Sequence, residues 1–265
     1  MSFAVPPSSN GSQRSSRNLF FLVSARDRRF VKEKISELEG MRVPFIVVCG
    51  EKINESNVVY RGVRGKWDAI NFGARFVPRD VDVVVLNDVD TRIHGFWYAL
   101  KHLDNGADLV HCKVKVPNGP QVKFYRIAEP IRKRFHIFAS GDLMLMRRGL
   151  FERVLPCPPC LAEDSYILFK ALEQGYRAYF CTETYVTSKK TSSPIEEEKY
   201  KARTTLGIYQ ALKYTRPPPL IRFFYKLLPL AAPLLAIAGK DGVAWMNGIR
   251  KAVKANVTKR HPTKF

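Results

Sequence analysis

Short apolar runs that alternate with helical patterns restrict the possible folds of this chain more than any other feature. Residues 19–23, 45–48 and 81–86 are each the length of one buried strand, and a helical spacing of apolar residues follows the first of them over residues 31–38. Gly40 is expected to end that helix. Strands that alternate with helices predict an α/β fold with a mostly parallel sheet between helices. The ligands of such sheets gather beyond the C-terminal ends of the strands.

The rest of the first 198 residues continues this pattern. A helix is expected over residues 67–76, and a second helix is expected to open at Glu163 and close at Gly175. Further strands are expected at residues 58–60, 107–116, 137–146 and 178–180. We therefore predict a leader at 1–17, a catalytic α/β domain at 18–198 and a C-terminal segment at 199–265.

The two ends of the chain differ from this domain. Residues 1–17 are rich in Ser, Pro, Asn and Gly and lack the apolar core of a signal peptide, so we expect a disordered leader without a signal peptide. The five cysteines are scattered apart from Cys157 and Cys160, which favours a reducing compartment over a disulfide framework. The predicted location is the cytoplasmic face of a membrane.

Positive charge is concentrated in the C-terminal segment. The chain has 44 Lys and Arg against 24 Asp and Glu, a net charge of +20, and residues 199–265 contribute +13 of it. A surface of this kind binds anionic partners: nucleic acid, an acidic membrane or a phosphate-bearing substrate.

Residues 220–238 combine apolar and aromatic side chains with nearby basic ones. Their uncharged part, residues 227–238, is 12 residues long and contains Pro229 and Pro233, whereas crossing a bilayer takes roughly 20 apolar residues. A simple transmembrane helix is therefore disfavoured. The composition predicts an amphipathic segment at the headgroup level of an anionic membrane, and leaves open whether it enters the bilayer as a broken hairpin.

Two acidic residues end the most strand-like run. Asp88 and Asp90 are two positions apart, which in extended chain sends both carboxylates to one side. Carboxylate oxygens are preferred ligands of Mg²⁺ and Mn²⁺, and such an ion would neutralise a diphosphate. The alternative is that the Asn-Asp-Val-Asp sequence only forms a turn.

A second segment has the features of a phosphate site. Gly65 and Lys66 place a lysine and free backbone amides at the start of a predicted helix, where anions are favoured. The alternative is a loop glycine followed by an exposed lysine.

Together these segments resemble the inverting family 2 glycosyltransferases of the GT-A fold. The resemblance covers about residues 18–210 and depends on the order and spacing of several short motifs. They are Gly65-Lys66 with Ala69, Asn71 and Gly73; Asp88-Val89-Asp90; Ser140-Gly141-Asp142 followed by Met146-Arg147-Arg148; and Glu163-Asp164.

The resemblance implies a Rossmann-like GT-A sheet and a role for each motif. Asp88 and Asp90 would hold Mg²⁺ or Mn²⁺, and Asp164 would be the catalytic base that takes the proton of an acceptor hydroxyl. A nucleotide-diphosphate sugar donor would contact Ser24, Ala25, Arg26, Asp27, Lys66, Asn71, Asp88 and Arg203. The acceptor would contact Ser140, Gly141, Asp142 and Glu163. Without this chemistry, Glu163 and Asp164 would only complement a helix dipole.

The sequence departs from the family pattern at two places. Arg203 and Gly207 keep the spacing of a segment that covers the diphosphate in processive members, but Thr204 and Tyr200 replace its usual tryptophan and glutamine. This argues against a processive polysaccharide synthase. Cys49-Gly50-Glu51 stands where paired aspartates are common near the base, so the nucleotide is not specified.

The predicted function is metal-assisted, inverting transfer of a sugar to a hydroxyl of a lipid-linked or membrane-proximal glycan acceptor. The alternative within the same resemblance is a polyprenyl-phosphate sugar synthase, whose phosphate acceptor needs no base. A more distant alternative is a basic nucleic-acid-binding protein. It is disfavoured because the sequence has no zinc-finger or RNP-type motif.

Overall fold

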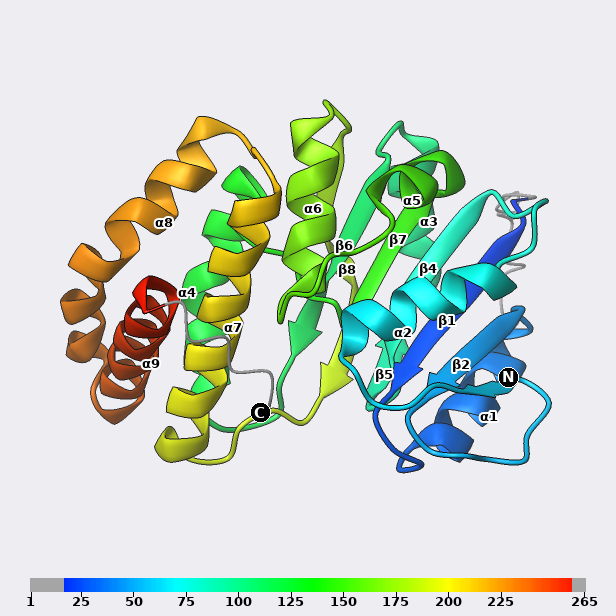
Figure 1. The fold of residues 1–265 in the computed structure, drawn as a ribbon, viewed down its shortest axis with the longest axis horizontal. Coiled ribbons are helices and arrows are strands. Elements are labelled where there is room, and N and C mark those ends of the chain that lie inside the picture. The colour runs from blue at the N-terminus through cyan, green and yellow to red at the C-terminus, as the bar shows by residue number, and fades with distance from the viewer. Residues whose placement is uncertain (1–16, 259–265) are drawn as a thin grey trace, which may run out of the picture.

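The computed structural model describes residues 17–258 and contains one eight-stranded sheet with helices on both sides (Figure 1). The strand order is β3-β2-β1-β4-β7-β6-β8-β5. In chain order the strands are β1 (Leu19–Ala25), β2 (Phe45–Cys49), β3 (Val58–Tyr60), β4 (Val83–Asp88), β5 (Thr91–His94), β6 (Leu109–Lys115), β7 (Leu143–Arg147) and β8 (Ala178–Ser188).

The sheet is parallel in its first half and mixed in its second. Strands β3, β2, β1 and β4 run parallel to one another, as the alternating pattern predicts. Strand β7 is antiparallel to both β4 and β6, and β5 is antiparallel to β8. Because β7 runs against β4, the segment that precedes β7 lies beside the C-terminal end of β4.

Both faces of the sheet are buried, which explains the near-continuous apolar strands. On β4, Val84 and Leu86 belong to one core layer, and Val83 and Val85 belong to the other. The first layer packs on helices α2, α5 and α6, and the second packs on α1 and α3 (Figure 1). The helices of these layers are α1 (Val31–Met41), α2 (Lys66–Gly73), α3 (Phe96–Asp104), α5 (Arg148–Val154) and α6 (Glu163–Glu173).

Most of the predicted elements are confirmed, with three differences. Gly40 lies inside α1, and the left-handed residue that ends this helix is Arg42, at φ 55°. The predicted helix at 67–76 ends as a 3-10 turn, η1 (Ala74–Phe76). The strand expected at 137–146 begins only at β7, because residues 136–142 form a loop at the cavity described below.

A group of four helices lies beyond the β8 side of the sheet (Figure 1). It comprises α4 (Pro120–Phe135), α7 (Pro194–Tyr214), α8 (Pro219–Ala231) with the 3-10 segment η2 (Ala232–Ala238), and α9 (Lys240–Val257). Helix α7 packs along α9, and it crosses residue 198 without a break. The boundary predicted at 198 therefore falls inside a helix. The predicted leader lies outside the described residues except for Arg17.

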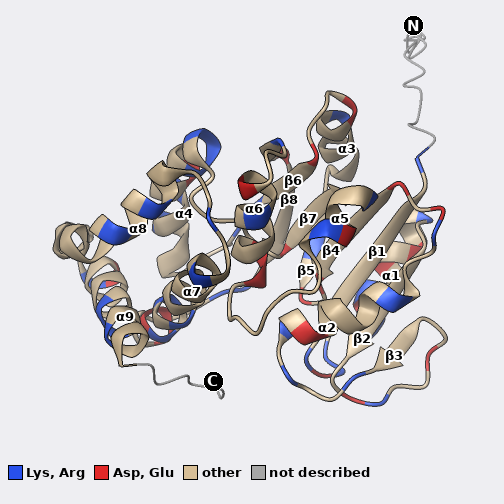
Figure 2. Ribbon diagram, turned by 45° about the horizontal axis from the view of Figure 1, so that its top comes forward, with Lys and Arg blue, Asp and Glu red and all other residues tan. Residues whose placement is uncertain are grey.

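The outer face of α8 and η2 is apolar and exposed. Its exposed side chains recur at helical spacing and are Leu220, Phe223, Leu227, Leu230, Leu234 and Ile237. Arg222 and Lys226 of α8 are exposed as well. Figure 2 shows the Lys and Arg positions along this helix in blue. The continuous run Pro219–Ala238 has 20 residues and a mean hydropathy of 1.7, so its length and composition are sufficient to cross a membrane. This run is longer than the 12 uncharged residues counted from the sequence because it also includes residues 219–226, with Arg222 and Lys226. The expectation against a simple transmembrane helix stays a prediction.

Candidate active site

One cavity of about 1390 Å³ lies where the sheet meets the four-helix group. The C-terminal ends of β1 and β4, the start of α2, the loop before β7 and the start of α6 all border it. This position is the one that open α/β sheets use for ligands. Most of the predicted site residues line it: Ser24, Ala25, Arg26, Asp27, Lys66, Asp88, Asp90, Ser140, Gly141, Asp142, Glu163, Asp164 and Arg203.

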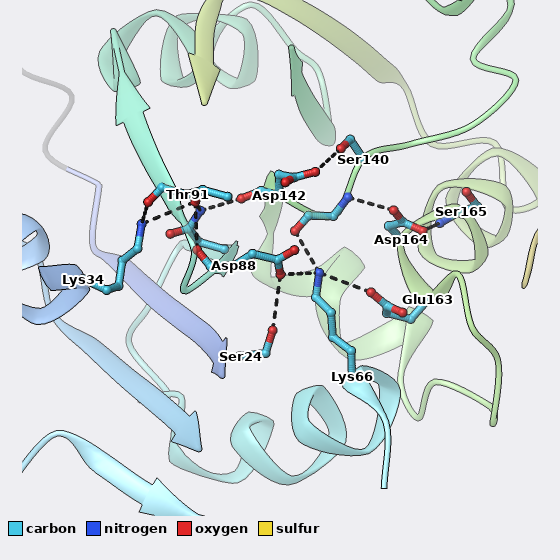
Figure 3. A network of polar contacts seen from close by, with 12 residues as sticks. Ser24, Lys34, Lys66, Asp88, Thr91, Ser140, Asp142, Glu163, Asp164 and Ser165 are labelled. Carbon is cyan, nitrogen blue, oxygen red and sulfur yellow. Dashed lines mark hydrogen bonds and ion pairs between the residues drawn. The ribbon is translucent and has the colours of Figure 1, made fainter. Parts of the chain in front are cut away.

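Lys66 connects the three polar segments of this site (Figure 3). Its Nζ lies 2.5 Å from Asp88 Oδ1 and 3.2 Å from Glu163 Oε1, and it donates to the Gly141 carbonyl at 3.0 Å. Burial lowers the pKa of Lys66, but the carboxylates of Asp88, Glu163 and Asp164 outweigh it, so that the pKa lies above its usual value. Lys66 is therefore a fixed cation among three acids.

The pair Asp88 and Asp90 faces the cavity. Ser24 Oγ donates to Asp88 Oδ1 at 3.4 Å, so β1 and β4 jointly position this carboxyl. Asp90 is exposed to the cavity, and local desolvation together with the charge of Asp88 raises the pKa of its carboxyl. A second cation beside two such carboxylates would relieve their repulsion. Asp90 is exposed, whereas Asp88 is half-buried and its Oδ1 is bound by Lys66 and Ser24. Two neighbouring carboxylates are the kind of donor that a hard divalent ion prefers.

Asp164 is held by two backbone amides at the start of α6. The Gly141 amide donates to Asp164 Oδ2 at 2.8 Å, and the Ser165 amide donates to Oδ1 at 2.6 Å. A Cβ on Gly141 would lie 2.6 Å from Lys66 Nζ and 3.1 Å from Asp164 Cβ, so a larger residue would displace the Lys66 ammonium and crowd Asp164. Burial raises the pKa of Asp164 and raises that of Glu163 to about 7, although Lys66 opposes both shifts. Such carboxyl groups are suited to accept a proton near neutral pH.

Asp142 differs from the other acids of the site because it is already paired. Its Oδ1 lies 2.5 Å from the Nζ of Lys190, and its Oδ2 accepts a hydrogen bond from Ser140. Burial raises the pKa of Asp142, but Lys190 and Ser140 outweigh it and keep the pKa low. Sequence reasoning missed Lys190, which lies after β8 and belongs to no motif. Asp142 therefore stays ionised and lines the cavity as one half of a buried ion pair.

Arginines surround the opposite side of the cavity. Arg26, Arg29, Arg61 and Arg64 line it together with Lys66, and Arg61 pairs with Asp68 at 2.8 Å. The two loop arginines at 61 and 64 were not predicted, because a basic loop residue carries no periodic signal. Arg203 of α7 is exposed and faces the same cavity, with its guanidinium 5.7 Å from the Tyr200 ring. These cations provide charge for a diphosphate.

Gly207 explains how α7 reaches this site. A Cβ at this position would lie 2.6 Å from the Ala162 backbone nitrogen, so a larger residue would push α7 away from the loop before α6. The spacing from Arg203 to Gly207 therefore has a steric reason in this chain, whereas Thr204 and Tyr200 line the cavity in place of the expected residues.

Asn71 is the one predicted donor residue that the structure places elsewhere. Its Nδ2 donates to the Cys157 carbonyl and its Oδ1 accepts from the Cys157 amide, both at 2.8 Å. It does not line the cavity. The prediction that Asn71 binds the donor is therefore wrong: this side chain fixes the loop before α6 to helix α2.

A second group of potential metal ligands lies outside the cavity. The ligand atoms of His102, Cys181 and Glu183 lie within 4.8 Å of one another. The centre of the His102 ring lies 3.7 Å from that of Tyr179, and the two rings are stacked. Cys181 of β8 lies opposite Cys112 of β6 in the strand register. All five cysteines are free thiols in this structure.

Comparison with known proteins identifies the fold but not the family. No protein-family model matches the sequence, and no curated protein matches it. Among solved structures, the mannosyltransferase PcManGT from Pyrobaculum calidifontis, in complex with GDP-Man and Mn²⁺, has a TM-score of 0.67 and 17% identity over 92% of this chain and 88% of that one.

Two further structures share the fold less closely. GalNAc-T7 with UDP, GalNAc and Mn²⁺ has a TM-score of 0.55 and 10% identity, over 94% of this chain and 59% of that one. A mycobacterial protein has a TM-score of 0.54 and 14% identity, over 77% of this chain and 76% of that one. The chain therefore has the GT-A fold of nucleotide-sugar transferases, as its motifs predict.

Proposed function

We propose that this protein is a metal-dependent, inverting glycosyltransferase of the family 2 type. It transfers a sugar from a nucleotide-diphosphate donor to an acceptor hydroxyl. One observation carries the proposal: Asp88, Asp90 and Asp164 face a single cavity, and Lys66 lies between the two acidic segments at 2.5 Å from Asp88. Structural neighbours that bind GDP-Man or UDP with Mn²⁺ support the class of donor.

The donor occupies the β1 side of the cavity in this proposal. Ser24, Ala25, Arg26 and Asp27 at the end of β1 contact the nucleotide, and Lys66 contacts the diphosphate. Arg203 approaches the same phosphates from α7. Arginine and lysine at these positions balance the charge of the leaving group.

Asp88 and Asp90 hold the divalent ion, Mg²⁺ or Mn²⁺. When bound, the ion neutralises charge on the diphosphate and so makes it a better leaving group. The chain's own part is to keep both carboxylates at the end of β4 and to offer Asp90 in an open position.

Asp164 is the general base. As the acceptor oxygen forms its bond to the anomeric carbon, the bond from that carbon to the diphosphate breaks, and the electron pair leaves with the diphosphate. The hydroxyl proton passes to the Asp164 carboxylate. Ser140, Gly141, Asp142 and Glu163 surround the acceptor on this side.

The C-terminal helices hold the site against an anionic membrane at its cytoplasmic face. The exposed apolar face of α8 and η2 supports this, together with Arg222 and Lys226 beside it. Ile221 and Tyr225 of the same helix are buried against the protein, which favours a helix that lies in the interface over one that crosses the bilayer. The acceptor is therefore lipid-linked or membrane-proximal.

A nucleotide-release assay tests the proposal. The protein is incubated with a panel of UDP-, GDP- and CMP-sugars in Mg²⁺, Mn²⁺ or chelator. We expect release of a nucleoside diphosphate from one donor, only with a divalent ion. Release that persists undiminished in chelator, or no release from the whole panel with lipid extract present, contradicts it.

A further inference from the structure

We propose that the cavity is also a hydrocarbon-chain site, in which the acceptor's lipid chain runs between α4, α7, α8 and α9 while its head reaches Asp164. This inference rests on the proposed function for the role of the head, but not for binding of the chain. The cavity walls, its size, the two faces of α8 and the environment of Lys201 each support it.

The cavity changes character away from the sheet. Beyond Tyr125 and Tyr200, its walls come from the four-helix group and are mostly apolar, with Lys201, Thr205 and Gln210 of α7 as polar members. The apolar residues include Phe124, Ala128, Ile208, Phe224, Leu228 and Trp245. We call this part of the cavity the apolar arm. A diphosphate or a sugar would gain little from such walls, whereas a hydrocarbon chain would be removed from water there.

The cavity has room for more than a sugar nucleotide. Sites for small ligands occupy roughly 300–1,000 Å³, and this cavity measures about 1390 Å³. Protein interiors are close-packed, so an apolar space of this kind within a folded chain calls for an occupant. A chain attached to the acceptor fills the arm without competing with the donor.

Helix α8 separates the apolar arm from the outer surface. Phe224 and Leu228 face the arm, whereas Phe223, Leu227 and Leu230 are exposed on the outer face. The apolar arm and the exposed outer face are thus separated by the thickness of one helix. A membrane lipid at the outer face would therefore have a short path into the arm.

The surroundings of the Lys201 ammonium indicate that water is largely excluded from this wall of the arm. Its Nζ lies 2.8 Å from the centre of the Phe124 ring and 3.8 Å from Glu197, the acid that faces it from the same helix. Burial lowers the pKa of Lys201 to about 7, although Glu197 opposes the shift. Aliphatic and aromatic groups therefore dominate the surroundings, which suits a hydrocarbon chain.

Fluorescence quenching tests the chain site without any transfer reaction. Trp245 lines the arm, so a full-length protein with Trp67→Phe and Trp97→Phe reports from the arm alone. The probe is dibrominated stearate, a chain whose heavy atoms quench nearby tryptophan. We expect saturable quenching that geranylgeranyl phosphate reverses and that GDP or UDP with Mn²⁺ leaves unchanged.

Matched variants separate the arm from the outer surface. Ala128→Phe and Ile208→Phe narrow the arm from two walls and should weaken probe binding at least tenfold, while Ile195→Phe, exposed at 72%, should not change it. A protein that keeps only Trp97, on the exposed side of α3, should show no saturable quenching. Circular dichroism confirms folding, and either narrowing variant suffices.

Three results would overturn the inference: no saturable quenching of Trp245, probe binding in both narrowing variants as tight as in the parent protein, or displacement of the probe by nucleotide. Because the readout is binding, it is independent of the proposed transferase activity. Failure of nucleotide release with intact probe binding would reject the transferase, whereas the reverse would reject only the chain site.

Discussion

The sheet and the C-terminal helices bury apolar residues in different ways. On β4, Val83 to Leu86 alternate between two covered faces, and all four are at most 2% exposed. On α8 and η2, apolar residues line an internal cavity on one side and remain exposed on the other, with Leu230 at 77% and Ile237 at 86%. Apolar patches of this kind mark interaction sites on soluble proteins. The sheet thus buries its apolar residues against its own helices. The face of α8 and η2 leaves apolar residues exposed, as interaction surfaces do.

The largest expected effect lies at the end of the sheet. Replacing Asp88 or Asp90 by Asn removes a metal-binding charge, and the loss of several kcal/mol of electrostatic stabilisation corresponds to a fall in kcat/KM of about 10³-fold. Steady-state nucleotide release measures it. Asp80→Asn, an exposed acid on the loop before β4, is the matched control and should retain full activity.

The next effect separates a hydroxyl acceptor from a phosphate acceptor. Asp164→Asn keeps an oxygen for only one of the Gly141 and Ser165 amides and cannot take a proton, so we expect transfer to fall by roughly 10²–10³-fold. Donor binding should be unchanged. Near-normal turnover would indicate an acceptor that is already ionised, such as a polyprenyl phosphate.

The exposed face of α8 and η2 should contribute strongly to membrane binding and little to donor chemistry. Changing Leu230, Leu234 and Ile237 together to Ser removes three exposed side chains, each worth about 1.5 kcal/mol or more on burial. We expect at least a hundredfold loss of binding to anionic vesicles in flotation. Trp97→Ser with Tyr98→Ser, two exposed aromatics on α3, is the control. Equal flotation of both variants would exclude the face on α8 and η2.

The electrostatic part of membrane binding should be smaller. Each basic residue near an anionic surface contributes about 1 kcal/mol, so Arg222→Gln with Lys226→Gln should weaken binding to acidic vesicles roughly tenfold to thirtyfold. Neutral vesicles should bind both forms alike. The same difference on neutral vesicles would point to altered packing of α8 instead.

The acidic limb of the pH profile reports the buried carboxyl groups. Burial raises the pKa of Asp164 and raises that of Glu163 to about 7, so both are increasingly protonated as the pH falls below neutrality. Because the base Asp164 must be ionised and burial raises its pKa, kcat should begin to fall at a higher pH than an ordinary aspartate would give. Glu163→Gln removes the neighbouring charge and should shift this limb to lower pH. An unchanged acidic limb in Glu163→Gln would show that the charge of Glu163 does not affect the ionisation of the base.

The sequence predicted the strands of the sheet and the polar end of the cavity because both depend on local patterns. The apolar strands near residues 19 and 81 are short, bounded and buried on both faces, and the acids at 88 and 90 follow directly from where β4 ends. The β1–β4 half of the sheet was thereby predicted, with its polar end.

Other features were missed because distant segments create them. Lys190 acquires its role only when β8 brings it to Asp142, and the apolar arm exists only once α4 packs beside α7 and α9. Asn71 was misassigned for the same reason: its partner, Cys157, is 86 residues away. The count of uncharged residues in the tail likewise could not show that α8 continues into η2 through two prolines.

Binding of a nucleoside diphosphate, measured by calorimetry in Mn²⁺ and in chelator, tests the central claim most directly. We predict that the wild type binds GDP or UDP in Mn²⁺, and that chelator or Asp90→Asn each reduce the affinity by at least tenfold. Equal affinity in Mn²⁺ and in chelator, with no change in Asp90→Asn, would contradict a metal site at the end of β4.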